Sequence, residues 1–210
     1  MLARRMADEN FRTVQEQGRY AAHVRAINRM VDGLRDQDGR GWLPHVAPLH
    51  GGANARLLSV LRDPGPKVRE GTGSGFLCIE NDDPTAEQQL EAFAAVGIEP
   101  GEIMPWNAYP WYINRQPKAS EREAGVEPLV RLIGLLPRLK VILLQGGDAA
   151  DTWRRLLRRY PHINVPSRFA VISTYHPSRQ ALWCADPAVR HARIQHRLDA
   201  YRGVAEALNR

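Results

Sequence analysis

Side chains suited to catalysis follow apolar segments of the sequence, at the points where those segments end. Asp63 follows the apolar run of residues 56–62 and precedes a Pro-Gly-Pro turn. His176 follows the apolar residues 169–174. A carboxylate held on a rigid turn can orient a water molecule or stabilise a developing cation, and a neutral imidazole can donate a hydrogen bond to a forming anion. Asp63 and His176 are therefore the first candidates for catalysis.

Both residues also have purely structural interpretations. An Asp before Pro-Gly commonly bonds its own backbone in a turn, and local spacing alone slightly favours this interpretation for Asp63. His176 is one of seven histidines, and beside Pro177 it can equally cap a segment or pack in the core. The tetrapeptide His-Pro-Ser-Arg directly after a predicted strand is more specific than the histidine itself.

Two further residues have the chemistry to bind a flat heterocycle. Asn107 carries an amide that both donates and accepts, which suits a pyrimidine edge with an N–H beside a carbonyl. Phe76 follows a glycine-rich segment and could stack on the ring, as flipped bases are held between aromatic or apolar walls. A turn-forming Asn is an equally good interpretation of Asn107, and core packing explains most phenylalanines.

Glycine and arginine residues adjoin these candidates. The glycine pair 146–147 and the glycine-rich segment 71–75 would let backbone N–H groups approach a phosphate closely. Neither segment matches a dinucleotide fingerprint or a P-loop, and tight turns need glycine in any case. Arg62 and Arg179 flank two of these loops and could contact a polyanion.

The elements that must position these residues alternate along the chain. Strands are predicted at residues 56–62, 102–107, 139–145 and 169–174, and an apolar segment at residues 76–79 follows the glycine-rich loop. Helices are predicted at residues 7–36, 83–96, 126–136, 149–160 and 186–208, the second with Asp83 as its N-cap. This alternation predicts an α/β fold with a mostly parallel sheet and helices on both faces. Ligands bind beyond the carboxyl ends of such strands, so we expect the polar clusters to converge on one edge.

Length and composition exclude several classes of protein. With 210 residues, 43% hydrophobic and 25% charged, the chain is expected to fold as one domain over residues 1–210, with residues 1–54 as an N-terminal helix and loop extension. No apolar run is long enough to span a bilayer, and the N-terminus does not match a secretory signal. Two cysteines are too few for a disulfide scaffold or a cysteine-bound metal cluster, so a reducing cytoplasm is the expected compartment.

The charge balance favours a polyanionic partner only modestly. The formal net charge is +6, and 26 of the 29 basic residues are arginine, the side chain best suited to bidentate phosphate contact. Arginine is also an ordinary residue of solvated faces. The paired arginines of residues 154–159 fit a solvated face better than a binding surface.

Taken together, the clusters between residues 57 and 179 resemble the uracil-DNA glycosylase superfamily. The order matches: an Asp-Pro loop after the first strand, a Phe-bearing segment, an Asn ending the next strand, an apolar strand ending in Gly-Gly, and Thr-Tyr-His-Pro-Ser. The Asp-Pro loop and the His-Pro-Ser element are the specific parts. The resemblance implies a three-layer α/β/α sandwich with a central, mostly parallel four-stranded sheet.

The resemblance also implies a role for each position. Asp63 would position the attacking water and stabilise the sugar cation, and His176 would stabilise the departing base anion. Asn107 would recognise the uracil edge, with Phe76 stacking on the base and Pro64 and Gly65 lining the substrate site. The implied DNA contacts are Arg62, Gly146, Gly147, Ser178, Arg179 and Gln180, the last two filling the space left by an extruded base.

The chain departs from the best-studied branch of this superfamily. There a tyrosine follows Asp-Pro and blocks the thymine methyl group, whereas this chain has Gly65. Arg62 replaces a polar uncharged residue. Some branches bind an iron–sulfur cluster through four cysteines, which this chain lacks, so neither a metal nor another cofactor is expected.

The leading hypothesis from the sequence is a monofunctional DNA-repair glycosylase, a monomer that releases uracil from DNA by base flipping. No lysine is placed to form a Schiff base, so no strand cleavage is expected. One alternative keeps the fold but accepts other deaminated bases, such as hypoxanthine or mismatched thymine. Another is a catalytically silent DNA-binding or lesion-sensing protein.

Overall fold

A sheet of four parallel strands forms the centre of the molecule, in the order β4-β2-β5-β6. The computed structural model describes residues 3–163 and 168–210. The strands are β2 (Leu57–Leu61), β4 (Ile103–Asn107), β5 (Val141–Gln145) and β6 (Ala170–Thr174). Nearly every residue of β2, β4 and β5 is buried, as continuous apolar runs in a parallel sheet require. The predicted parallel four-stranded sheet is confirmed.

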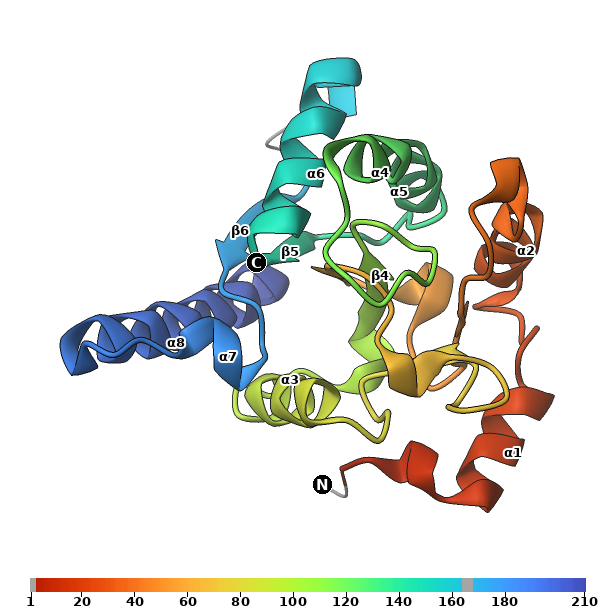
Figure 1. Cartoon of the computed structure of the whole chain (residues 1–210), viewed down its shortest axis with the longest axis horizontal. Coiled ribbons are helices and arrows are strands. Elements are labelled where there is room, and N and C mark those ends of the chain that lie inside the picture. Colours follow the sequence, from red (N-terminus) through yellow and green to blue (C-terminus); the bar gives the residue numbers. More distant parts are fainter. Residues whose placement is uncertain (1–2, 164–167) are drawn as a thin grey trace.

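Helices cover both faces of this sheet (Figure 1). On one face lie α3 (Pro84–Ala94) and α8 (Pro187–Asn209), and on the other lie α4 (Ala119–Ala124), α5 (Val126–Gly134) and α6 (Gly147–Arg159). Side chains alternate along β2 accordingly: Leu58 and Val60 pack in the core beside α5 and α6, and Leu57 packs in the core beside α3 and α8. The α/β sandwich predicted from the sequence is present.

The cap predicted for α3 is present, and a short helix precedes α8. The Asp83 carboxylate accepts hydrogen bonds from the backbone N–H groups of Thr85 at 2.9 Å and Ala86 at 3.0 Å. Between β6 and α8 lies α7 (Arg179–Leu182). Single 3₁₀ turns occupy several connecting segments: Arg5–Ala7, Gln37–Gly39, Gly52–Asn54, Pro66–Val68, Pro100–Glu102 and Pro161–Ile163.

The predicted single helix over residues 7–36 is wrong. The segment forms two helices, α1 (Glu9–Gln17) and α2 (Arg25–Leu34), separated by a turn that begins at Gly18. A Cβ at Gly18 would lie 2.9 Å from the side chain of Pro48, so the close approach of these segments requires glycine. The apolar residues of α1 and α2 follow one continuous helical spacing in the sequence, so the turn between the two helices could not be predicted from it.

The apolar segment of residues 76–79 lies outside the central sheet. It contains a two-residue strand, β3 (Phe76–Leu77), paired in parallel with β1 (His45–Val46) in a separate small sheet. The backbone of β1 is also tied to α2, because Asn28 donates to the Val46 carbonyl at 3.0 Å and accepts from the Val46 N–H at 2.8 Å. The N-terminal segment thereby packs against the loop that follows β2.

The strand register aligns the carboxyl ends of the four strands. Leu61 of β2 is opposite Asn107 of β4, and Gln145 of β5 is opposite Thr174 of β6. The loops that follow these residues therefore begin at one edge of the sheet, as predicted. No helix within the described ranges is both long enough and apolar enough to cross a membrane.

Candidate active site

A cavity of about 660 Å³ lies at the carboxyl edge of the central sheet. Its size is typical of small-molecule sites. Ten of the twelve site residues predicted from the sequence line it: Arg62, Asp63, Pro64, Gly65, Asn107, Gly146, Gly147, His176, Ser178 and Gln180. They come from the loops after all four strands, so residues more than 100 positions apart in sequence share one cavity.

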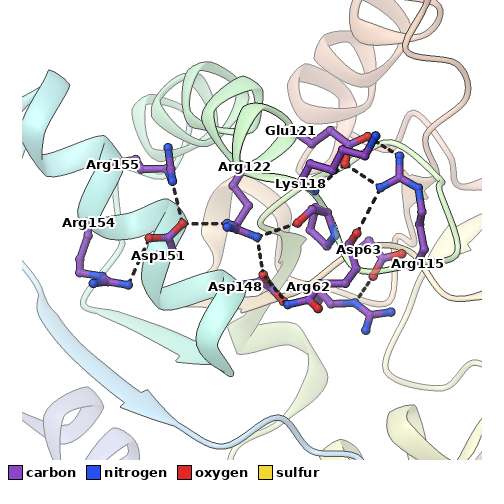
Figure 2. A network of polar contacts seen from close by, with 12 residues as sticks. Arg62, Asp63, Arg115, Lys118, Glu121, Arg122, Asp148, Asp151, Arg154 and Arg155 are labelled. Atoms are coloured by element: carbon purple, nitrogen blue, oxygen red, sulfur yellow. Dashed lines mark hydrogen bonds and ion pairs between the residues drawn. The ribbon is translucent and has the colours of Figure 1, made fainter.

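Asp63 supplies a buried carboxylate. Its side chain is only 3% exposed, and it forms an ion pair with Arg62, which is itself half-exposed. Burial raises the pKa of Asp63 above its ordinary value, while the neighbouring Arg62 guanidinium acts in the opposite direction. The Asp63–Arg62 pair lies beside the ion pairs of Arg115 and Arg122 (Figure 2). The carboxylate is therefore fixed in position and largely removed from bulk water.

His176 supplies a neutral hydrogen-bond donor. The backbone N–H of Ser178 donates to Nδ1 of His176 at 3.2 Å, and the Ser178 hydroxyl lies 3.0 Å from the same nitrogen. Since a backbone N–H can only donate, Nδ1 is the acceptor and the proton of the neutral ring is on Nε2. Burial lowers the pKa of His176 to about 4, so the ring is uncharged at neutral pH.

Asn107 supplies an amide without a partner. Its side chain is 1% exposed, and its Nδ2 atom has no hydrogen bond within the described part of the chain. A buried amide without a hydrogen-bond partner lowers the stability of the fold by about 1–3 kcal/mol, and a ligand with a matching acceptor would offset this loss. Of the side chains predicted to contact a base, Asn107 is the one that lines the cavity and, among the residues described, has no hydrogen-bond partner for its Nδ2 atom.

Two glutamines that the sequence analysis missed also line the cavity, and a hydrogen-bonded chain holds them. Gln89 of α3 and Gln145 of β5 both donate to the Ser59 hydroxyl, at 3.0 and 2.8 Å. Tyr201 of α8 donates to Gln145 at 2.7 Å. Gln145 was detectable as the last residue of the strongest apolar strand, whereas nothing in the pattern of α3 distinguishes Gln89.

A second carboxylate near the cavity was also missed. Asp148, in the first turn of α6, lines the cavity and forms an ion pair with Arg122 at 3.0 Å. Arg122 also binds Asp151 at 2.7 Å, so Asp148 belongs to the network in Figure 2. Asp148 is thus paired by a firmly held arginine, unlike Asp63, whose partner is half-exposed.

Phe76 and Arg179 are the two predicted residues that do not line the cavity. Phe76 is buried against Met6, Ala47 and Cys78, with its ring tilted against that of His45. The cavity wall next to it is formed by Leu77, Cys78 and Ile79. Core packing therefore accounts for Phe76 in this structure. Arg179 is exposed at the start of α7.

Gly146 sits where the loop after β5 meets the loop of His176. Its φ of 99° and ψ of 170° belong to a region that is essentially restricted to glycine. A Cβ here would lie 3.3 Å from Cβ of His176. The Gly146 N–H donates to the Thr174 carbonyl at 2.8 Å, so this amide is engaged within the protein and does not point to a free phosphate site.

Gly146→Ala is expected to lower the free energy of unfolding by about 1–3 kcal/mol, because alanine is strained in this conformation. It is also expected to displace His176, so any activity of the site should fall with it. Gly147→Ala is the matched control, since a Cβ at Gly147 meets no atom within 4 Å. Thermal melts of the two variants measure the difference, and equal stability would contradict the constraint at Gly146.

Stability is expected to fall as the pH drops from about 6.5 to 4. Burial lowers the pKa of both His50 and His176 to about 4, from the 6.5 of an unfolded chain. In this window the unfolded state binds more protons, so acid favours unfolding. For the fully buried His50 the loss is about 2 kcal/mol at pH 5.

Melting temperatures between pH 7.5 and 5 measure this effect. The raised pKa values of Asp63 and Asp83 act in the opposite direction, so variants are needed to isolate the histidine contribution. His176→Gln should make the pH dependence shallower, whereas the same change at the exposed His191 should not. A pH dependence that is identical in both variants would refute the assignment to His176.

Comparisons with known proteins do not identify this chain. No protein-family model matches it, and no curated protein is significantly similar to it. Within residues 3–163 and 168–210, no three His, Cys, Asp or Glu side chains are grouped to bind a metal ion. The site therefore brings together three groups around one cavity: a buried carboxylate, a neutral imidazole donor and an amide without an internal partner.

Proposed function

We propose that this chain is a DNA glycosylase that hydrolyses the N-glycosidic bond of uracil in DNA, as its resemblance to the uracil-DNA glycosylase superfamily implies. The observation that carries the proposal is that Asp63 and His176 line one cavity in opposite electrostatic roles. The first is a buried carboxylate and the second is a neutral N–H donor with its proton on Nε2.

These roles fit the cleavage of a glycosidic bond. As the bond breaks, positive charge develops on the sugar and negative charge on the departing base. Asp63 would stabilise the cation and orient the attacking water, while Nε2–H of His176 would donate to the base anion. Fixed groups in a cavity shielded from water act strongly on such charges, because little reorganisation is needed during the reaction.

Recognition of the base would fall to Asn107. Its unpaired amide has the donor and acceptor that the N–H and carbonyl of a uracil edge require. Gln89 and Gln145 line the same cavity and could contact the remaining carbonyl. The base would enter by flipping out of the helix, because its glycosidic bond is inaccessible inside a duplex.

The decisive experiment is a base-release assay on single- and double-stranded oligonucleotides that contain one uracil. We expect free uracil and an abasic site, with strand cleavage only after alkali or heat. Salt-sensitive binding of the oligonucleotide without base release would overturn the proposal in favour of a silent DNA-binding protein.

One observation favours a broader substrate range. A Cβ at Gly65 would meet no atom within 4 Å, so the space next to the Asp63-Pro64 turn is open. This is the position at which a tyrosine would exclude the thymine methyl group in the best-studied branch. A second candidate function is therefore release of mismatched thymine or hypoxanthine in addition to uracil.

Gly65→Tyr is expected to raise the uracil-to-thymine ratio of release rates by at least about tenfold, the usual value of one methyl group in a closed pocket. Gly65→Ala is the matched control, because a methyl group adds little bulk and φ of Gly65 is −74°, which alanine adopts freely. Release from uracil opposite guanine and thymine opposite guanine gives the ratio. An unchanged ratio in Gly65→Tyr would show that methyl discrimination lies elsewhere.

A further inference from the structure

The two halves of α8 have different surroundings. After Asp199 the helix buries Ala200, Tyr201, Val204 and Leu208 against the rest of the molecule. Residues 187–198 contain no buried residue, and this half extends past α7, away from the sheet (Figure 1). This half buries no side chain of its own, so most of its surface is open to something outside the chain.

The projecting half carries a net positive charge. Residues 187–198 include Arg190, Arg193 and Arg197 but no acidic residue. The acidic residues at its two ends are engaged: Asp186 accepts from the backbone N–H of Ala188 at 2.8 Å, and Asp199 pairs with Arg202 at 3.1 Å.

The arginines of α6 provide a contrast. Arg155 there binds both Asp151 and Glu123, at 2.8 and 3.1 Å. None of the three arginines in the projecting half of α8 has an ion-pair partner among the residues described. A charge left unpaired in this way attracts polyanions.

Two of the three arginines, Arg193 and Arg197, contact the segment that forms the rim of the cavity. The spacing of three and four residues places all three on one side of the helix. Arg193 donates to the carbonyl of Trp183 at 2.8 Å, and Arg197 donates to the carbonyl of Pro177 at 3.0 Å. Between these carbonyls lie Ser178, Gln180 and Ala181, which line the cavity. Each guanidinium has five N–H donors, so most of them are free for a ligand.

An exposed aromatic ring completes this surface. Trp183, directly after α7, is 65% exposed, more than any other large hydrophobic side chain in the described part of the chain. The guanidinium of Arg193 lies 5.7 Å from the ring centroid of the neighbouring Tyr175, which is 37% exposed. Exposed aromatic rings beside arginines are typical of surfaces that bind single-stranded nucleic acid, where bases stack on the rings.

We propose that Trp183, Arg190, Arg193 and Arg197, here called the α8 arm, bind the nucleic-acid strand that leaves the cavity. The arginines contact its phosphates, and Trp183 stacks on an unpaired base. The inference extends the proposed function, on which it relies only for the identity of the polyanion. The arm would hold the strand independently of the base in the cavity.

Fluorescence anisotropy with a single-stranded oligonucleotide that lacks uracil tests the arm without involving catalysis. Trp183→Leu is expected to weaken binding by about tenfold, the usual value of one stacked base, and Trp183→Phe should recover most of the loss. Arg190, whose side chain has no internal hydrogen bond among the described residues, is the cleanest charge to remove. Arg190→Ala should weaken binding and lower the slope of log Kd against log salt by about 0.7.

Arg154→Ala is the matched control, because it removes an exposed arginine from α6, on the other face of the sheet, and leaves Asp151 paired with Arg122 and Arg155. It should leave the affinity unchanged, and circular dichroism should show that all variants keep their helix content. Equal affinities for Trp183→Leu, Arg190→Ala and the parent chain would overturn the proposal. Binding to vesicles containing phosphatidylserine that depends on the arm, with no binding of the oligonucleotide, would also overturn it, in favour of a membrane surface.

The two proposals fail separately. A chain that binds the uracil-free oligonucleotide through the arm but releases no uracil refutes only the glycosylase function. A chain that releases uracil while the arm variants bind normally refutes only the arm.

Discussion

Asp63→Asn is expected to slow uracil release by about 10²–10³-fold or more, with no loss of stability. The substitution keeps the shape of the side chain but removes the charge that would stabilise the sugar cation. Burial raises the pKa of Asp63, which means that the folded protein disfavours its ionised form, so a neutral amide is tolerated at least as well. Arg62 loses its charged partner, but its side chain is 44% exposed, so water can solvate the guanidinium instead.

Single-turnover base release and thermal melts measure the two effects. Asp148→Asn is the informative comparison, because Asp148 is the other carboxylate lining the cavity near His176. It is paired with Arg122, so its charge is already balanced, and a loss of less than about tenfold is expected. An Asp148 variant as impaired as the Asp63 variant, or an active Asp63→Asn, would reverse the assignment of the carboxylate role.

His176→Ala is expected to slow uracil release by about 10²–10³-fold, because it removes the N–H that would donate to the departing base. His176→Gln should recover part of this rate, since it restores a neutral N–H donor. Because the pKa of His176 is lowered to about 4, its protonation state does not change between pH 6 and 9. We therefore expect no step from this residue in the pH dependence of uracil release by the parent chain in that range.

Ser178→Ala separates orientation of the ring from donation by it. The variant loses the hydroxyl 3.0 Å from Nδ1 but keeps the backbone N–H that fixes the tautomer, so a loss of only a few-fold is expected. A step in the pH–rate profile near pH 6.5 that disappears in His176→Gln would instead indicate a protonated histidine. That result would contradict the neutral-donor role.

The central strands and their polar ends could be predicted because local and global requirements agree there. Strands of a parallel sheet are covered on both faces, so Leu57–Leu61 and Val141–Gln145 are buried and mostly apolar, with Ser59 and Gln145 as the polar exceptions. Once the strands were identified, the parallel arrangement alone brought Asp63, Asn107 and His176 to one edge. None of these residues alone identified a functional site, but their common position at the ends of strands did indicate one.

The parts that could not be predicted depend on contacts between distant segments. The break at Gly18 is imposed by Pro48, 30 positions away, and leaves no mark on the apolar spacing. Phe76 packs against Met6 and Ala47, which come from distant parts of the sequence, whereas the adjoining Leu77 and Cys78 line the cavity. Gln89 lies within α3 and reaches the cavity only because Ser59, on a different element, accepts its hydrogen bond.

The hydrogen bonds from Tyr201 through Gln145 and Ser59 to Gln89 join both helices of one face beneath the cavity. Any change of size or shape in the bottom of the cavity would have to break this chain and shift α3 or α8 with it. The rim has no such restraint, since Gly65 stands in open space and Gln180 is exposed. Substitutions in the surrounding loops should therefore alter the shape of the cavity at less cost in stability than substitutions at the residues beneath it.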